Sequence, residues 1–176
     1  MSALSRWQIC GFIFTGIFGS FLHFLYDLSG NSIILAPFSA VNESVWEHMK
    51  ILFFPMFIFA LVESKFIKES FSSFWSAKLS GLLIGLILIP VLFYTYTGIL
   101  GKSIDLINIA IFFLSAAVAF RLETLLLKNK AALGISEAVA LITICLIGLI
   151  FAVTTFIQPN IPLFIDSATG KSGIKQ

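Results

Sequence analysis

One short segment of this chain holds most of the side chains that could bind a ligand or transfer a proton. It reads Asn42-Glu43-Ser44-Val45-Trp46-Glu47-His48, and Lys50 follows two residues after His48. Carboxylates, imidazoles and amines are the groups that hold metal ions or act as general acids and bases in proteins. Segment 42–50 is therefore the first candidate site, with Asn42 and Trp46 as further candidates for ligand binding.

Part of this segment also has a structural explanation. Ser44 and Glu47 are spaced as in a capping box, in which each side chain satisfies a backbone N–H group at the start of a helix. Asn42 could cap the helix instead, with Glu43 favoured beside it by the helix dipole. The pattern is compatible both with capping plus ion pairing and with a substrate, ion or metal site.

The spacing of the charged residues is compatible with both interpretations. If a helix begins near residue 42, Glu43, Glu47 and Lys50 share one face, and two carboxylates one turn apart repel unless a cation lies between them. Lys50, three residues after Glu47, or a bound metal ion could be that cation. His48 would point about 100° away from Glu47.

His23 and Asp27 form a second candidate pair. They are four residues apart at the end of an apolar stretch, so they share one face of a helix. The functional interpretation is a general base or a metal ligand, and the alternative is a hydrogen-bonded pair at the helix end. Tyr26 would line the mouth of a cavity, together with Trp46.

The two groups together suggest a metal site, although no standard metal motif is present. The di-iron pattern Glu-x-x-His and the zinc-protease pattern His-Glu-x-x-His are both missing from the sequence. The side chains suited to zinc or a similar divalent ion are His23, Asp27, Glu43 and Glu47. A divalent metal ion is the cofactor that this set would hold, and His23 or His48 would be the catalytic base.

The C-terminal segment carries a third feature. Its pattern Pro159-x-x-Pro162-Leu-Phe-x-Asp166 combines two prolines with an apolar pair. This predicts that residues 159–166 dock onto the rest of the protein, with Asp166 able to cover the polar residues as part of a lid. Residues 171–176 are expected to form a disordered tail.

The elements that would position these residues are transmembrane helices. Of the 176 residues, 59% are hydrophobic and only 11% are charged, whereas soluble domains carry about 25% charged residues. About 20 apolar residues in a helix cross a bilayer, and helices satisfy their own backbone groups there. The sequence predicts an all-α polytopic membrane protein, with one domain over 1–170 and about five spanning helices near 7–26, 45–62, 79–99, 104–120 and 133–157.

Basic residues predict the orientation of this bundle in the plasma membrane. With the N-terminus inside, the outer connections near the membrane hold only Lys50 and Lys102, and the inner helix ends hold Arg6, Lys65, Lys68, Lys78, Arg121, Lys128 and Lys130. The positive-inside rule therefore places the N-terminus inside and the C-terminus outside.

The two ends of the bundle differ in polarity. Most of the polar residues singled out above belong to the outer end. At the inner end, Glu63 with Lys65 and Glu123 with Arg121 are interpreted as loose ion pairs of anchoring side chains, without a function.

The candidate segments also support a resemblance. The string 42–48, with His23-Phe-Leu-Tyr26 before it and Pro162-Leu-Phe-x-Asp166 after the last helix, resembles a family of small uncharacterised bacterial polytopic membrane proteins over the whole chain. The resemblance implies a helical membrane bundle and no particular activity. The motifs of ceramidase-like hydrolases and of CAAX-type intramembrane proteases are not matched.

Three functions fit these observations. The first is a binding or transport-type protein, in which an outward-facing polar pocket under segment 28–44 and the tail binds a cation or a small polar ligand. The second is a metal-assisted enzyme of the outer leaflet that acts on a lipid or lipid-linked substrate. The third is an accessory subunit that docks a partner. The lipid bilayer is the expected surrounding, the oligomeric state is left open, and a net charge of only +2 without a basic tract argues against nucleic acid.

Overall fold

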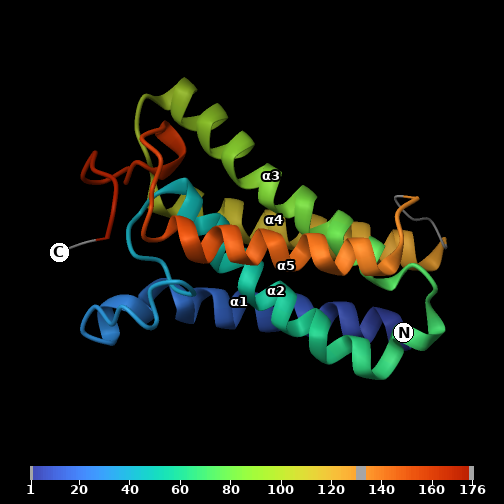
Figure 1. Ribbon diagram of the computed structural model, residues 1–176. Helices are drawn as coiled ribbons and strands as arrows, with labels where there is room; N and C mark the ends of the chain where they lie inside the picture. Colours follow the sequence, from blue (N-terminus) through green and yellow to red (C-terminus); the bar gives the residue numbers. More distant parts are fainter. Residues whose placement is uncertain (1, 130–133, 175–176) are drawn as a thin grey trace.

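The structure is a computed structural model that describes residues 2–129 and 134–174. It is all-helical, as the sequence predicts (Figure 1). The helices are α1 (Ala3–Leu28), α2 (Val45–Ile67), α3 (Phe74–Leu100), α4 (Asp105–Lys128) and α5 (Glu137–Thr154), with the short 3-10 turns η1 (Lys68–Ser70) and η2 (Pro162–Phe164).

The start of α3 depends on a residue of α5. α3 begins at Phe74 rather than near residue 79. The carboxylate of Glu137 accepts hydrogen bonds from the backbone N–H groups of Trp75 at 2.8 Å and Ser76 at 3.1 Å. Such an acceptor satisfies the first N–H groups of a helix, which have no partner within it. The expected start of the fifth helix at residue 133 lies outside the described residues.

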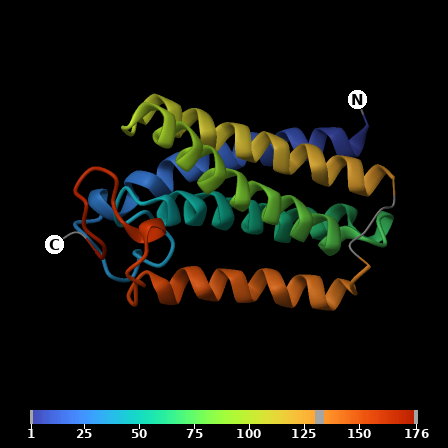
Figure 2. The same cartoon turned by 90° about the horizontal axis from the view of Figure 1, so that it is seen from above.

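α2 is the central helix of the bundle. It contacts each of the other four helices, and Figure 2 shows it with α3 between α5 on one side and α1 with α4 on the other. Glycines of α1 let this helix pack closely against α2 and α4. A Cβ atom at Gly19 would lie 3.0 Å from the carbonyl oxygen of Ile51 and 2.6 Å from the ring of Phe112. Small residues at such positions are typical of closely packed membrane helices.

Apolar side chains cover the outside of the bundle, and charged side chains lie within it. α1, α3, α4 and α5 are long and apolar enough to cross a membrane. Their exposed residues include Ile17, Phe24, Ile87, Leu106, Leu146 and Leu149. Among the described residues of the five helices, five charged side chains are at most 2% exposed: Glu47, Lys50, Glu63, Lys78 and Glu123. Charged side chains are almost never buried to this degree unless they are paired, so their partners define the polar interior.

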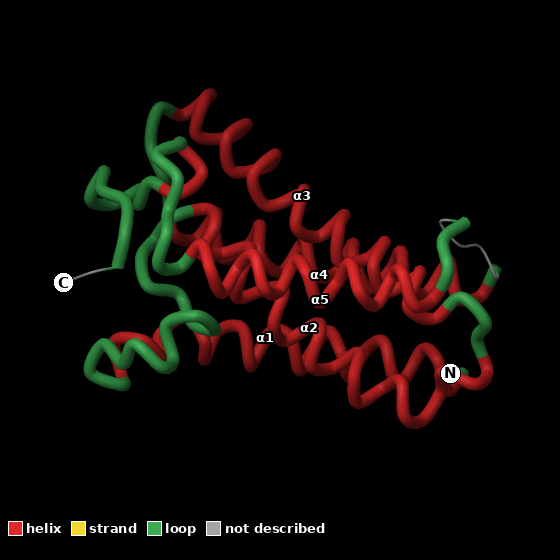
Figure 3. The backbone as a smooth tube through the Cα atoms, in the orientation of Figure 1, coloured by secondary structure: helices red, strands yellow, loops and turns green. Residues whose placement is uncertain are grey.

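The longest connections gather at one end of the bundle. Residues 29–44, between α1 and α2, and residues 155–174 lie at the end opposite the start of α1 (Figure 3). Ala36, Ser39 and Val41 of the 29–44 loop are buried. This loop therefore packs against the helices. Most of the polar residues that the sequence analysis singled out lie at this end.

Candidate metal centre

His23, Glu43 and His48 converge at the loop-rich end of the bundle. Nε2 of His23 lies 3.4 Å from Oε2 of Glu43, and Nε2 of His48 lies 3.8 Å from the same oxygen. One ligand atom from each residue can be chosen so that all three lie within 4.8 Å of one another. The residues come from α1, from the loop before α2 and from the first turn of α2. Two imidazoles and one carboxylate in this arrangement are a potential three-ligand metal site.

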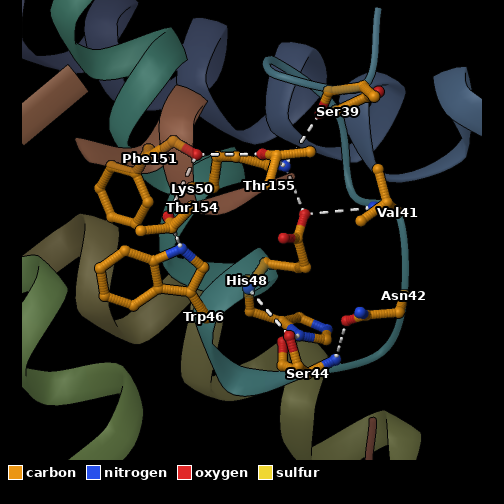
Figure 4. A network of polar contacts seen from close by, with 12 residues as sticks. Ser39, Val41, Asn42, Ser44, Trp46, His48, Lys50, Phe151, Thr154 and Thr155 are labelled. Carbon is orange, nitrogen blue, oxygen red and sulfur yellow. Dashed lines mark hydrogen bonds and ion pairs between the residues drawn. The ribbon is translucent and has the colours of Figure 1, made fainter. Parts of the chain in front are cut away.

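A second contact orients the ring of His48. Its Nδ1 lies 2.8 Å from the carbonyl oxygen of Ser44 (Figure 4). Because a carbonyl oxygen only accepts hydrogen bonds, Nδ1 carries the proton and the lone pair of the neutral ring lies on Nε2. Histidine ligands in metal sites are commonly oriented by such a contact of their other ring nitrogen. His48 is thus held with its lone pair directed toward Glu43.

A small cavity lies beside the two histidines. Its volume is about 60 Å³, and it lies among residues of α1, α2 and α4. Its polar lining includes His23, His48 and Asn108, and the rest is mostly apolar. A cavity needs about 10–15 Å³ on this measure to hold one water molecule. There is therefore room for water or a small chemical group next to the imidazoles.

The C-terminal segment holds the backbone of Glu43. The N–H group of Glu43 donates to the carboxylate of Asp166 at 3.2 Å, and the Ser167 hydroxyl donates to the carbonyl oxygen of Glu43 at 3.2 Å. The other oxygen of Asp166 accepts from the N–H groups of Ala168 and Thr169. Asp166 therefore closes a turn in the tail and fixes the position of a candidate ligand, without belonging to the cluster itself.

Glu47 and Lys50 form a separate ion pair. Nζ of Lys50 lies 2.5 Å from Oε2 of Glu47, and both side chains are fully buried. The ammonium also donates to the carbonyl oxygen of Ala36 and to the hydroxyl of Thr155, each at 3.0 Å. Glu47 accepts the N–H group of Val41 at 3.1 Å (Figure 4). This pair joins α2 to the 29–44 loop and to the end of α5, and Glu47 does not belong to the group of His23, Glu43 and His48.

The start of α2 explains why Glu43 and Glu47 separate. The helix begins at Val45, with Ser44 as its N-cap, and the Ser44 hydroxyl accepts the N–H group of Glu47. The Asn42 side chain in turn accepts the N–H group of Ser44 at 2.9 Å. Glu43 precedes the helix, so the shared face expected for the two carboxylates does not form. Only the Ser44 half of the expected capping box forms, because Glu47 turns to Lys50.

The pairing expected between His23 and Asp27 also differs from the structure. Asp27 is exposed at the end of α1, while His23 lies against Glu43. Tyr26 is buried and packs with Ala36 of the loop. The structure therefore groups His23 and Glu43 with His48, in place of Asp27 and Glu47. Only the helix start at Ser44 could have indicated this, by placing Glu43 outside the helix.

Trp46 anchors the tail rather than lining the cluster. Its indole N–H donates to the Thr154 hydroxyl at 2.9 Å, and its ring stacks on Phe164 with centroids 4.6 Å apart.

Farther along the tail, the carbonyl oxygen of Gly173 accepts a hydrogen bond from the Asn42 amide at 2.9 Å, and its N–H group donates to the Gln158 side chain at 2.7 Å. Residues 171–174, for which the sequence suggests disorder, thus include an ordered contact, and 175–176 lie outside the described residues.

A second charged cluster lies at the other end of the bundle. Nζ of Lys78 lies 2.5 Å from Oε2 of Glu63 and 2.5 Å from Oε2 of Glu123. The Gln8 amide donates to Glu63 at 2.9 Å. The sequence predicts that both acids are loose ion-pair partners of neighbouring basic residues. This was wrong, because the two carboxylates face the interior and share Lys78.

These features define a class: a five-helix bundle with an apolar exterior compatible with a membrane, which encloses the buried Glu47–Lys50 pair and the Lys78 cluster. Over residues 1–174 the chain matches a family described as "Family of unknown function (DUF6512)", and it belongs to that family. No curated protein and no solved structure matches the chain.

Proposed function

We propose that this chain is an integral membrane protein that binds a divalent transition-metal ion, such as zinc, through His23, Glu43 and His48. The observation that carries the proposal is the convergence of their three ligand atoms within 4.8 Å. Zinc binds histidine nitrogen and carboxylate oxygen at about 2.0–2.2 Å, so its ligands lie roughly 3–3.6 Å from one another. Small side-chain movements would bring this cluster to that geometry.

The surroundings of the cluster suit a metal ion better than a simple ion pair. His48 is oriented through Nδ1, and Glu43 is fixed through its backbone by the tail. A simple ion pair would need neither constraint. The adjoining cavity leaves a coordination position open to water or to a ligand, and an open fourth position is typical of catalytic rather than structural zinc sites.

The bilayer is the surrounding that the exterior of the bundle supports. Large apolar residues such as Ile17 and Leu106 are 69% and 76% exposed, and burying them in lipid removes that apolar surface from water. The N-terminus lies inside. Lys50 and Lys78 are buried and do not act as anchors. The exposed basic residues of the described chain lie mostly at the end opposite the loop-rich one, namely Arg6, Lys65, Lys68, Arg121 and Lys128, against Lys102 and Lys171 at the loop-rich end.

Metal analysis of the purified protein tests this proposal. The protein is prepared in detergent with an affinity tag that contains no histidine, and its metal content and zinc affinity are measured. We expect one zinc ion per chain. His48→Ala and Glu43→Gln should each lower the affinity at least about tenfold, since even residues behind the ligands contribute that much.

Asp27→Asn is the matched control for this experiment. Asp27 is an exposed carboxylate one turn from His23, so its loss should leave the zinc affinity unchanged. Wild-type protein that binds no zinc, or variants of His48 and Glu43 that bind as tightly as wild type, would refute the proposal.

The cavity favours a second candidate function, metal-assisted hydrolysis of a lipid. It adjoins both histidines, and its rim includes Ile109 and Phe113, which are exposed on the apolar exterior of α4. A lipid could therefore approach the ion from the bilayer. Long-chain fluorogenic esters and amides in mixed micelles test this: zinc-dependent turnover that is lost in His23→Ala supports it, and equal turnover by wild type and His23→Ala contradicts it.

A further inference from the structure

The buried cluster around Lys78 draws one side chain from each of four helices. Glu63 belongs to α2, Lys78 to α3 and Glu123 to α4, and each is at most 2% exposed. Gln8 of α1 is 4% exposed and donates to Glu63. The rings of Phe74 and Phe120 face the Lys78 ammonium at 5.4 Å and 5.9 Å. The cluster is thus enclosed by apolar groups and by its own members.

The charges of this cluster do not balance. Two carboxylates and one ammonium leave one negative charge in excess when all three groups are ionised, and Gln8 is neutral. Among the described residues, the other charged groups nearby do not supply a cation. Glu137 of α5 is an acid whose carboxylate accepts the N–H groups at the start of α3. Arg121 and Lys128 are exposed beside a groove.

An uncompensated charge in such a place is costly. Transfer of one unpaired ion from water to a protein interior costs several kcal/mol even after relaxation. A carboxyl group avoids this cost by taking up a proton and becoming neutral. We propose that the Lys78 cluster is a proton-binding site that takes up one exchangeable proton on the carboxyl group of Glu123.

The hydrogen bonds explain why Glu123 rather than Glu63 holds the proton. The Glu63 carboxylate faces two donors, the Gln8 amide and the Lys78 ammonium. The donor that the structure shows on Glu123 is Lys78, through Oε2. The other carboxylate oxygen of Glu123 lies next to Gly81. A Cβ atom placed on this glycine would be 2.7 Å from that oxygen. The less compensated carboxylate is the one that protonation neutralises at the lower cost.

A groove provides a route by which water reaches the edge of the cluster. It has a volume of about 350 Å³, lies between α1 and α4, and is lined by Ser5, Gln8, Arg121, Thr124 and Lys128, among others. Gln8 therefore connects the groove to the carboxylate of Glu63. With the N-terminus inside, this route opens to the cytoplasmic side.

Infrared difference spectroscopy of the full-length protein tests the proposal. Spectra are recorded in lipid nanodiscs between acidic and alkaline pH, in H₂O and in D₂O. Wild type should show one C=O stretching band of a protonated, buried carboxyl group that disappears at high pH and shifts on deuteration. The band should be absent in Glu123→Gln. It should persist in Glu69→Gln, which removes an exposed acid of η1.

Folding gives a second readout that a merely structural ion pair would not produce. Glu123→Gln resembles the protonated state, so it should fold, match the melting temperature of wild type at acidic pH and exceed it at alkaline pH. Three results would overturn the proposal: no titrating carboxyl band in wild type, a band that survives in Glu123→Gln, or a Glu123→Gln protein that fails to fold. A melting temperature that rises with sodium at constant ionic strength, without any such band, would also overturn it, because a bound sodium ion would then balance the charge.

Discussion

The backbone N–H group of Glu43 lies 3.2 Å from a carboxylate oxygen of Asp166. The two residues are 123 positions apart in the chain, and Ser44, which follows Glu43, forms an isolated antiparallel bridge with Asp166. A candidate metal ligand before the second helix is therefore positioned by the segment after the last helix. The tail is part of the site's support.

Removal of Asp166 should weaken metal binding. Asp166→Ala removes the acceptor of the Glu43 N–H group and opens the turn at 166–169, so Glu43 loses its fixed position. We expect the zinc affinity to fall about 10- to 100-fold, the range found for residues that orient ligands. Titration calorimetry on the purified protein measures this. Lys171→Ala, an exposed change in the same segment, should leave the affinity unaltered, and an equal loss in both variants would argue against the specific role of Asp166.

The Glu47–Lys50 pair should behave as a buried, mutually dependent unit. Lys50→Met leaves a fully buried carboxylate without its ammonium, which we expect to lower the free energy of unfolding by about 3–5 kcal/mol. Denaturation in mixed SDS micelles measures this change. Adding Glu47→Leu should recover most of the loss, because the unpaired charge is gone. Lys102→Met, at an exposed position, should change stability by less than about 0.5 kcal/mol; a Lys50→Met protein as stable as this control would contradict the prediction.

The contact between Trp46 and Phe164 should protect the tail from proteases. Trp46→Ala removes both the ring stacking and the hydrogen bond to Thr154, so residues 159–174 should open more often. We expect faster tryptic cleavage after Lys171, followed by mass spectrometry of the intact protein. Trp7→Ala removes a stacked ring at the other end of the bundle and should leave the cleavage rate near that of wild type. If both variants are cut as slowly as wild type, the tail is held by other contacts.

Labelling of single cysteine variants tests the orientation of the protein in the membrane. In a Cys10→Ser, Cys145→Ser background, Lys102→Cys should react with a membrane-impermeant maleimide on intact cells, because the proposed orientation places the connection between α3 and α4 outside. Lys68→Cys should react only after the membrane is opened, because the same orientation places η1 on the cytoplasmic side. The reverse pattern would mean that the N-terminus lies outside.

Local sequence patterns were sufficient to predict that the chain forms five helices, but not to predict where α3 begins. Long apolar runs predicted five helices, and the spacing of Ser44 and Glu47 indicated the start of α2, where Ser44 is the N-cap. These features depend on residues within one or two turns of each other, so they can be read along the chain. The same patterns could list the polar side chains, but they could not pair them.

The partners of those side chains were decided only by the tertiary structure. Spacing within a helix placed Glu43 with Glu47 and Glu123 with Arg121. In the folded chain Glu43 faces His23 and His48, and Lys78 binds an acid 45 positions away. The physical reason is that a buried charge must find its partner across a helix interface. Which groups meet there depends on how far each helix is rotated and where it begins, and packing of the whole bundle sets both.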